Sequence, residues 1–130
     1  MATLTLMVGL PGSGKTTRAK ELAERTGALR LTPDEWQTRL FDDDMHHPDH
    51  DRRHGEVEAI MWEVAARAVA LGAACRVDFE NVELSELERR IAARNRLPGG
   101  HFAIPIAVLR GWADLFEAPD DAEMAGRFSD

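Results

Sequence analysis

The sequence predicts an α/β fold in which a parallel β-sheet is flanked by helices. Three observations lead to this prediction. Two short stretches rich in apolar residues, TLTLMVGL and ACRVDF, predict strands, and the first lacks a strict alternation of polar and apolar residues, which is typical of a strand covered on both faces. Segments with helical periodicity lie between these stretches and after them. Strands that alternate with helices form right-handed βαβ units, and such units build a parallel sheet.

Composition limits the kind of protein. The chain has 130 residues, of which 44% are hydrophobic, so we expect a single domain over residues 1–130 with one packed core. The formal net charge of −7 would repel a nucleic-acid backbone or an anionic membrane, so we expect a small-molecule partner instead of nucleic acid or membrane. One cysteine excludes an internal disulfide, and no uncharged run resembles a membrane span or a signal peptide. We therefore expect a cytoplasmic protein.

The elements of the first half follow from local patterns. After the strand in TLTLMVGL, the stretch KTTRAKELAERTG predicts a helix that ends at Gly27 in a left-handed C-cap. A second strand is expected in ALRLTPDEW, ending near Thr32, because Pro33 breaks it. Residues 42–54 are rich in aspartate and histidine and contain a proline, so they predict an exposed loop. Their donors lack the rigid spacing of a structural zinc site.

The second half begins with a helix whose apolar residues recur at helical spacing until Gly72. A third strand is expected in ACRVDF. The helix in SELERRIAARNRL is predicted to start at Ser85, because Ser85 and Glu88 have the spacing of a capping box. The stretch PIAVLRGWADLF predicts a helix opened by Pro105, and the acidic tail after Pro119 is expected to be frayed.

The stretch GLPGSGKTT predicts a phosphate-binding loop. Residues 9–16 match the pattern G-x-x-x-x-G-K-[ST], and they lie between a predicted strand and a predicted helix, as this motif requires. Its glycines let backbone N–H groups point at a phosphate, and the helix N-terminus adds partial positive charge. We expect Lys15 to reach the β- and γ-phosphates and Thr16 to bind Mg²⁺. The nucleotide-binding residues expected from the motif are Gly9, Pro11, Gly12, Ser13, Gly14, Lys15, Thr16 and Thr17.

A phosphate-binding loop occurs in kinases, GTPases and ATPases, so other positions must discriminate among them. The Asn-Lys-x-Asp motif that reads guanine is missing from the sequence, which disfavours a GTPase. A phosphotransferase needs a carboxylate that orients or deprotonates the acceptor hydroxyl.

Several stretches together point to one family: GLPGSGKTT, LTPDEW, HDRRH with VEAIMWEVA, VDF, ELERRIAARN and LFEAPD. Through them the chain resembles the small P-loop kinase-like ATP-binding proteins related to chloramphenicol phosphotransferase, zeta toxin and the polynucleotide kinase domain. The resemblance covers most of the chain, and the phosphate-binding loop is its most specific part. It implies an adenylate-kinase-like P-loop NTPase core and ATP-dependent phosphorylation of a hydroxyl group on a small molecule.

The resemblance implies roles for two carboxylates. Asp34 matches the family's carboxylate at the end of the second strand, which serves as the base or orients the acceptor. The carboxyl end of a parallel strand is also where ligands bind in open α/β sheets. The alternative role for Asp34 is to cap the following helix. Asp78 stands in the place of a Walker B-type carboxylate that holds a magnesium-bound water.

The resemblance also implies a lid-like helix over residues 85–97 or so. Arg90 and Arg94 match the family's lid arginines, which close over the transferred phosphoryl group and neutralise its charge. The alternative is that these arginines form a solvated helix face that balances Glu86 and Glu88.

The chain departs from the resembling fold by about one βα unit. Those proteins have a helix and a further strand between the third strand and the lid helix, but the few residues between Phe79 and Ser85 are too short for a crossover. Natural shortening and a lost segment both explain this. The missing strand would flank TLTLMV, so we expect an open strand edge and a homodimer that covers it. The alternative is a monomer in which CRVDFENVEL folds back over the edge.

The sequence thus predicts an ATP- and Mg²⁺-dependent phosphotransferase that acts on a hydroxyl group of a small molecule. In this interpretation Lys15 holds phosphates, Thr16 and Asp78 hold magnesium, Asp34 acts on the acceptor and Arg94 closes the site. The alternatives are a non-catalytic ATP-binding module, an ATPase without acceptor, and a polynucleotide 5′-hydroxyl kinase, which the acidic charge disfavours.

Overall fold

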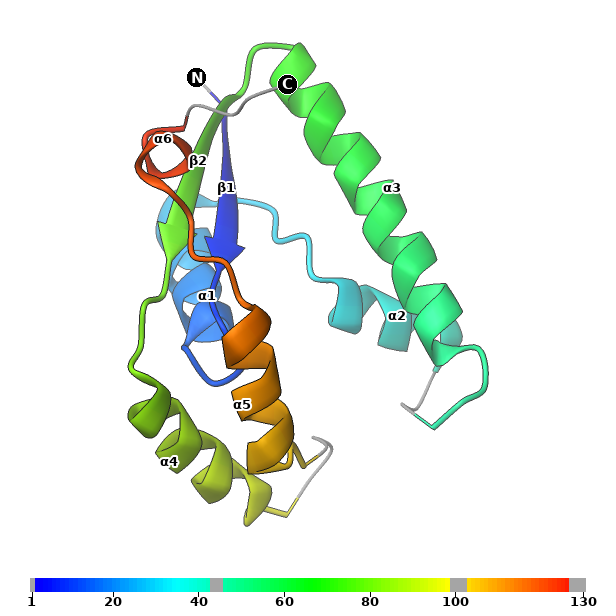
Figure 1. The fold of residues 1–130 in the computed structure, drawn as a ribbon. Coiled ribbons are helices and arrows are strands. Elements are labelled where there is room, and N and C mark those ends of the chain that lie inside the picture. The colour runs from blue at the N-terminus through cyan, green and yellow to red at the C-terminus, as the bar shows by residue number, and fades with distance from the viewer. Residues whose placement is uncertain (1, 43–45, 99–102, 127–130) are drawn as a thin grey trace.

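The computed structural model describes residues 2–42, 46–98 and 103–126 (Figure 1). These residues form two strands and six helices. In chain order the elements are β1 (Thr3–Val8), α1 (Lys15–Thr26), α2 (Pro33–Phe41), α3 (His50–Ala70), β2 (Ala74–Phe79), α4 (Leu84–Asn95), α5 (Ile106–Leu115) and α6 (Asp121–Met124).

The sheet consists of β1 and β2, which lie side by side and run parallel (Figure 1). Thr3 lies opposite Ala74 at one end of the pair, and Val8 lies opposite Phe79 at the other. The helices α1, α2 and α3 connect the two strands. The predicted α/β fold is therefore confirmed, in a shortened form.

The strand predicted in ALRLTPDEW is wrong. Residues 28–32 have no strand, and Thr32 is instead the N-cap of α2, with Pro33 in its first turn. Leu29 is 79% exposed. Arg30 donates hydrogen bonds to the side chains of Thr32 and Glu35, at 3.2 and 2.5 Å. These bonds hold the stretch at the start of α2, so its short apolar pattern does not become part of the sheet.

The exposed loop predicted over residues 42–54 is shorter than expected, because α3 begins at His50. Residues 43–45 lie outside the described part of the chain. The side-chain amide of Gln37 in α2 donates to the backbone oxygen of His50, at 3.0 Å. Arg53 lies over the ring of Phe41, at 4.6 Å from its centroid. These contacts with α2 stabilise a helical turn whose polar sequence predicted a loop.

The capping box predicted at Ser85 is also wrong. α4 begins one residue earlier, and its N-cap, Glu83, makes no side-chain capping bond. Glu88 is unavailable for the box because it accepts from Arg110 of α5, at 2.6 and 3.2 Å. A capping box does form at Asp120, where α6 starts in the tail that we expected to be frayed. Residues 127–130 of that tail lie outside the described residues.

The most deeply buried core lies where α4 and α5 meet the loop after β1. Leu10 of this loop packs against the buried cluster, together with Val82 and Ile106. The side-chain amide of Asn95 in α4 donates to the backbone oxygen of Ile104 and accepts from its N–H, at 2.8 and 3.0 Å. The cluster itself consists of Leu87, Ile91, Ile104 and Leu109. The phosphate-binding loop is thus anchored by the core.

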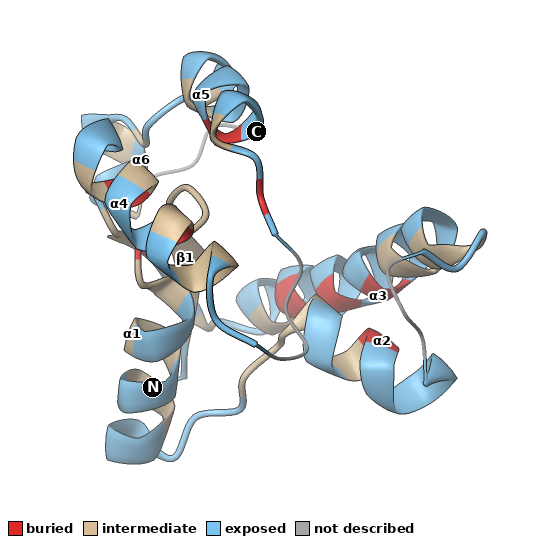
Figure 2. Ribbon diagram, turned by 90° about the horizontal axis from the view of Figure 1, so that it is seen from below, coloured by how far each residue is buried: buried red, intermediate tan, exposed pale blue. Residues whose placement is uncertain are grey.

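The helices α2 and α3 form a second packed unit. The buried residues of α3 lie on one side, and they are Val57, Met61 and Ala65. Figure 2 shows this side of α3 turned toward α2, while both helices stand apart from α1, α4 and α5. α3 also contacts β1.

Candidate nucleotide-binding site

The loop between β1 and α1 has the backbone of an anion-binding loop. Gly12 and Gly14 have φ angles of 81° and 99°, a conformation that residues with a Cβ rarely adopt. Gly14 is also the N-cap of α1, where no side chain caps the helix and the first turn has no acidic residue. A Cβ on Gly14 would meet nothing within 4 Å. Open space therefore lies beside Gly14, at a helix N-terminus without a side-chain cap, and helix N-termini of this kind bind phosphates.

Gly9 and Gly12 allow close packing around the loop. A Cβ on Gly9 would lie 2.5 Å from Oγ of Ser13, and one on Gly12 would lie 3.1 Å from Cδ1 of Ile91. The loop thus folds tightly upon itself, and α4 packs against its outer side.

Ser13 carries a buried hydroxyl that is unsatisfied. The residue is 3% exposed, and its Oγ has no hydrogen-bond partner in the described parts of the chain. A buried hydroxyl without a partner costs free energy. A phosphate oxygen at the loop would be a suitable acceptor, so this hydroxyl fits a bound nucleotide.

The ammonium group of Lys15 contacts the loop itself. Its Nζ donates to the backbone oxygens of Gly9 and Leu10, at 2.5 and 3.0 Å. Burial lowers the pKa of Lys15 from its usual value. The lysine is therefore held over the loop, at the position from which its motif predicts a phosphate contact. The neighbouring Thr16 and Thr17 are exposed in the first turn of α1, and Pro11 is half-buried.

Asp78 lies near the carboxyl end of β2, opposite Met7. Its Oδ2 accepts from Nε of Arg18 in α1, at 3.3 Å, and its side chain is 14% exposed. The structure thus pairs Asp78 with Arg18, two residues beyond Thr16. Hydroxyl and carboxylate oxygens are suitable ligands for Mg²⁺, which needs few protein ligands beside the phosphates of a nucleotide. Thr16 fits this role directly, whereas Asp78 fits it only if the contact with Arg18 is exchanged.

The structure brings Arg90 of α4 to the loop. Its Nη1 lies 3.2 Å from the backbone oxygen of Gly12 and 3.5 Å from that of Ser13. Its Nε donates to Glu86, at 3.0 Å. Hydrogen bonds from Arg89, and then from Arg90, lower the pKa of Glu86 to about 2. Arg90 thus combines the two alternatives predicted for this helix. It reaches the phosphate-binding loop, and it also pairs with the acidic residue Glu86.

Arg94 follows Arg90 one turn later in α4 and is half-buried. This helix supplies two residues of the deepest core, Leu87 at 1% and Ile91 at 0% exposure. Both arginines therefore project from a helix that is already packed against the loop.

Asp34 lies in the first turn of α2, where its carboxylate is 86% exposed. Its Oδ1 is 3.0 Å from Nε2 of His54 in α3, and Nδ1 of the same histidine is 3.8 Å from Glu58. Asp34 is not the N-cap of α2, because Thr32 has that position, so the capping alternative is wrong. Its helix lies apart from the phosphate-binding loop (Figures 1 and 2).

An open hollow of about 460 Å³ lies on α2 beside this carboxylate. Its lining residues are Asp34, Glu35, Thr38 and Arg39. All four lining residues belong to α2 and the hollow is open to solvent, so it is a shallow surface feature and not an enclosed ligand pocket.

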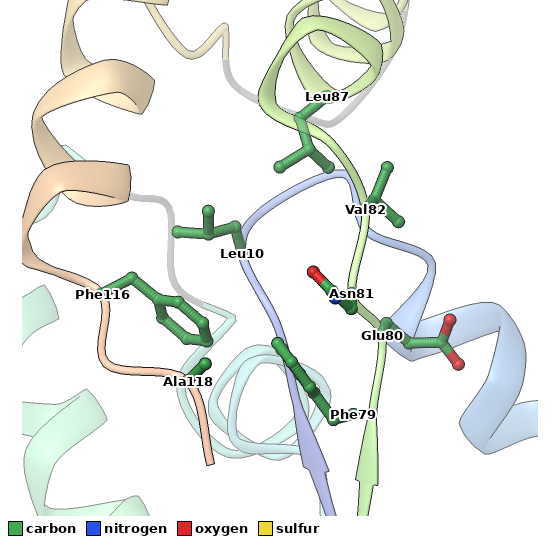
Figure 3. Close-up of a pocket in the computed structure, with 8 residues that line it drawn as sticks. All are labelled: Leu10, Phe79, Glu80, Asn81, Val82, Leu87, Phe116 and Ala118. Carbon is green, nitrogen blue, oxygen red and sulfur yellow. The ribbon is translucent and has the colours of Figure 1, made fainter. Parts of the chain in front are cut away.

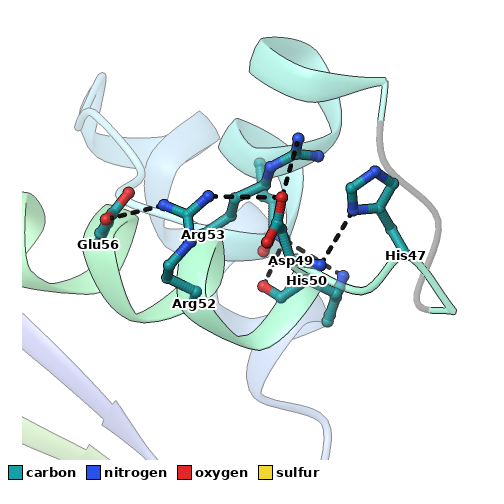
Figure 4. Close-up of polar contacts among 7 residues, drawn as sticks. His47, Asp49, His50, Arg52, Arg53 and Glu56 are labelled. Carbon is teal, nitrogen blue, oxygen red and sulfur yellow. Dashed lines mark hydrogen bonds and ion pairs between the residues drawn. The ribbon is translucent and has the colours of Figure 1, made fainter.

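The start of α3 is a cluster of ion pairs (Figure 4). Asp49 pairs with Arg52 and Arg53, at 3.5 and 3.9 Å, and Arg52 also pairs with Glu56, at 3.1 Å. His47 accepts from the backbone N–H of Asp49. Among the residues that the structure describes, no group of three or more histidine, cysteine or acidic side chains could hold a metal ion.

A small cavity lies at the carboxyl ends of both strands, next to the phosphate-binding loop (Figure 3). It measures about 110 Å³, and the rings of Phe79 and Phe116 stack beside it, 6.0 Å apart. Typical ligand pockets measure roughly 300–1,000 Å³, so this cavity has room for only part of a ligand. The lining residues are Leu10, Phe79, Glu80, Asn81, Val82, Leu87, Phe116 and Ala118.

Two contact residues of the candidate site residues were not predicted from the sequence: Arg18, which contacts Asp78, and His54, which contacts Asp34. Arg18 had no local signal, because its partner Asp78 is sixty residues away in the chain. His54 was assigned to an exposed loop, and its position one turn into α3 is what brings it to Asp34.

Comparison with known families gives one match: the family described as an AAA domain matches residues 4–89, well over half of the chain. The matched region includes β1 from its second residue, the phosphate-binding loop, β2 and the first part of α4. No comparable match was found among curated proteins or among solved structures. The match supports a P-loop kinase-like protein but not the particular relatives that the sequence resembles. No helix in the described residues is long and apolar enough to cross a bilayer.

Proposed function

Because the chain belongs to the AAA domain family of P-loop proteins, we propose that it binds ATP with Mg²⁺ and transfers the γ-phosphate to a hydroxyl group of a small molecule. The family match supports nucleotide binding and a kinase-like domain. The transfer reaction and the class of acceptor are our proposal.

The observation that carries the proposal is the state of Ser13. Its buried hydroxyl lacks a partner in the described chain, and it lies in a loop with open space beside the N-cap Gly14. An anion at this position would accept from Ser13 and from the N–H groups at the start of α1. A simple glycine turn would not need a buried, unsatisfied hydroxyl, whereas a phosphate site would use it.

Lys15 supplies the positive charge for the terminal phosphates. Because its Nζ already lies over the loop, it needs only to exchange the oxygens of Gly9 and Leu10 for phosphate oxygens. The cost of holding a partly buried ammonium group is offset when an anion binds beside it. Bound Mg²⁺ would neutralise charge on the phosphates, with Thr16 and Asp78 as its protein ligands or water-binding groups.

Arg90 and Arg94 act from a helix that is already in place. α4 is packed against the loop through Ile91, and Arg90 already contacts the backbone oxygens of Gly12 and Ser13, which supports a role for this helix beside a bound phosphate. Preorganised cations of this kind stabilise the charge of a phosphoryl group during transfer.

Asp34 acts on the acceptor. Its exposed carboxylate borders the hollow on α2 and contacts His54, which orients it. Since α2 lies apart from the loop, transfer requires α2 and α3 to approach the nucleotide, a movement common among phosphotransferases. Asp34 would then accept the proton of the attacking hydroxyl.

The second candidate function is a nucleotide-binding module without transfer. Two observations favour this function. Asp78 is paired with Arg18, and Asp34 belongs to a helix pair that stands apart from the loop. Such a protein would bind ATP for stability or as a signal.

One experiment separates these functions. The protein is incubated with γ-labelled ATP and Mg²⁺, with and without panels of nucleosides, sugars, aminoglycoside-type and other hydroxyl-bearing compounds, and oligonucleotides, and both labelled products and free phosphate are measured. Transfer of label to one class of hydroxyl compound supports the proposal. Phosphate release without an acceptor would indicate an ATPase. ATP-dependent thermal stabilisation with neither product would indicate a binding module.

A further inference from the structure

We propose that Glu86 and Arg90 form a positioning pair that holds the phosphate-binding loop in the conformation that receives a nucleotide diphosphate group. Glu86 orients the guanidinium group of Arg90, and Arg90 in turn fixes the peptide between Gly12 and Ser13. The inference rests on the proposed function, because it concerns the same loop. It assigns a role to Glu86, a carboxylate that the proposed function leaves unused.

Arg90 fixes one peptide of the loop. Its Nη1 donates to the backbone oxygen of Gly12, at 3.2 Å, and the N–H of Ser13 donates to the oxygen of Leu10, at 3.1 Å. The peptide between Gly12 and Ser13 is therefore bonded at both of its polar groups. A trans peptide is planar, so two such bonds define the orientation of the whole group. The buried side chain of Ser13 starts from this fixed peptide.

The next peptide is turned the same way. The backbone oxygen of Ser13 lies 3.5 Å from the same Nη1, and in a trans peptide the N–H of Gly14 points in the opposite direction. The first backbone bond of α1 runs from the N–H of Arg18 to the oxygen of Gly14, so the N–H groups before Arg18 have no acceptor within the helix. Arg90 thus keeps two carbonyl oxygens, which would repel a phosphate, away from the side to which the N–H of Gly14 points.

Arg90 differs from Lys15 in what nucleotide binding requires of it. Lys15 bonds the oxygens of Gly9 and Leu10 and has to leave them to reach a phosphate. Arg90 bonds the loop from α4, and its bonds can persist while a phosphate lies at the N–H groups. The guanidinium group therefore acts through the backbone of the loop.

Glu86 determines where the guanidinium group of Arg90 points. Its Oε1 accepts from Nε of Arg90 at 3.0 Å, one helical turn away, and glutamate before arginine is the favoured order for such a pair. Since the guanidinium group is a planar fork, a bond at Nε directs Nη1 as well. Arg89 bonds both oxygens of Glu86, at 2.7 and 2.6 Å, and keeps the carboxylate in place.

The core fixes the backbone that carries this pair. Leu87 and Ile91 directly follow the two residues in α4, and they are 1% and 0% exposed. Ile91 also packs on the loop, because a Cβ on Gly12 would lie 3.1 Å from its Cδ1. Two neighbouring residues of α4 thus contact Gly12, one through an apolar side chain and one through a hydrogen bond.

This geometry predicts which part of a nucleotide depends on the pair. The backbone N–H groups of a phosphate-binding loop cradle the α- and β-phosphates, which ATP and ADP share. A loop that is already in the receiving conformation loses less entropy on binding, so the pair should strengthen binding of both nucleotides equally. An arginine that bound the γ-phosphate would strengthen binding of ATP alone.

The test is calorimetric titration of the full chain with ATP and with ADP, both in Mg²⁺. Arg90→Met should weaken both nucleotides by the same factor, about 10-fold, as expected for the loss of one charge-assisted hydrogen bond. Arg90→Lys keeps the charge but cannot bond Glu86 and the loop with one planar group, so it should weaken both to a similar extent.

A double-mutant cycle tests whether Glu86 acts through Arg90. Glu86→Gln should weaken both nucleotides about 3-fold, as an exposed ion pair contributes little by itself. The double variant with Arg90→Met should bind no more weakly than Arg90→Met alone, because both changes remove one interaction.

Amide hydrogen exchange without nucleotide follows the loop directly. The amide of Ser13, which donates to Leu10, should exchange faster in Arg90→Met and in Glu86→Gln than in the wild type. A residue that merely stabilised the fold would change global unfolding and leave this amide as protected as its neighbours in the core.

Two variants of the same helix serve as controls. Glu88→Gln removes a carboxylate that bonds Arg110 of α5, and Arg96→Met removes an exposed positive charge at the end of α4. Both should leave the affinities for ATP and ADP and the exchange of Ser13 unchanged. Circular dichroism checks that each variant is folded at the temperature of the titration.

Three results would overturn the proposal. They are a loss of ATP affinity in Arg90→Met without an equal loss of ADP affinity, full rescue by Arg90→Lys, and unchanged exchange of Ser13 in Arg90→Met. Binding and exchange are measured without phosphoryl transfer. A protein that gives the expected results here but transfers no phosphate would therefore contradict only the proposed function.

Discussion

Nε2 of His54 lies 3.0 Å from Oδ1 of Asp34, and this contact joins α3 to the first turn of α2. The carboxylate is 86% exposed, whereas the imidazole is 30% exposed. A side chain that acts on a substrate must be accessible to it, and a less exposed neighbouring side chain can hold it in one orientation. The structure thus shows an exposed carboxylate beside a half-buried histidine, and the proposed acceptor-side role of Asp34 rests on this arrangement.

We predict that Asp34→Asn reduces phosphotransfer by about 10²-fold or more, which is a typical contribution of a positioned general base. ATP affinity should stay nearly unchanged, because Asp34 lies apart from the phosphate-binding loop. Product formation at saturating ATP and the dissociation constant of ATP are measured separately. Asp51→Asn, at an exposed aspartate in the first turn of α3, is the matched control. Loss of ATP binding with normal transfer at saturation would assign Asp34 to the nucleotide side.

We predict that Lys15→Ala abolishes the thermal stabilisation of the protein by ATP. Lys15 is the charged side chain of the motif itself, and its ammonium group contacts the loop. With ATP at about a hundred times its dissociation constant, the wild type should gain about 2 to 3 kcal/mol in free energy of unfolding. Thermal unfolding with and without ATP measures the difference, and Lys20→Ala, on an exposed position of α1, is the control. An unchanged stabilisation in Lys15→Ala would refute the phosphate-binding assignment.

We predict opposite effects from removing the two partners of the Arg18–Asp78 ion pair. Asp78→Asn should weaken ATP binding about 10-fold in Mg²⁺ and leave binding in a chelator unchanged, since the carboxylate acts through the metal. Arg18→Met frees the carboxylate and should strengthen binding in Mg²⁺. Calorimetric titration in Mg²⁺ and in a chelator measures the dissociation constant of ATP for each variant. If both variants lose the same affinity with and without Mg²⁺, the pair is structural and Asp78 has no metal role.

We predict that low pH reduces the free energy of unfolding through Glu86. Its folded-state pKa of about 2 is below the usual 4.5, because Arg89 and Arg90 donate hydrogen bonds to the ionised form. A lowered carboxyl pKa stabilises the fold above the unfolded-state pKa, and this contribution is lost as pH falls from about 4.5 through 2. In Glu86→Gln the urea midpoint should be lower at neutral pH and should fall less between pH 5 and 2.5. Glu63→Gln, at an exposed position of α3, serves as the control.

The sequence predicted the parts of the fold that depend on local pattern. The bounds of β2 and the C-cap at Gly27 are as predicted, and Gly27 has the left-handed φ of 70°. The phosphate-binding loop was predictable for the same reason, because neighbouring residues form it.

The errors arose where one particular side-chain partner, and not the residue pattern, decides the outcome. Residues 28–32 have a pattern that suits a strand, but Arg30 bonds forward to Glu35 and the stretch leads into α2. Ser85 and Glu88 have the spacing of a capping box, but Arg110 of α5 takes the carboxylate. The residue pattern of a segment does not predict which of these partners its side chains bond. The same holds for Asp78. Whether its carboxylate can serve a magnesium ion or stays in the ion pair depends on Arg18, a residue from another element.

Leu10 shows how packing restricts a motif that chemistry leaves open. In the pattern G-x-x-x-x-G-K-[ST] its position accepts any residue, because only backbone groups there approach a phosphate. In this protein its side chain packs against the cluster of Leu87, Ile91, Ile104 and Leu109. Ordering of the loop by a nucleotide would then be transmitted directly to α4 and α5. A polar residue at this position should uncouple ligand occupancy from the cooperativity of unfolding while leaving every phosphate-contacting group in place.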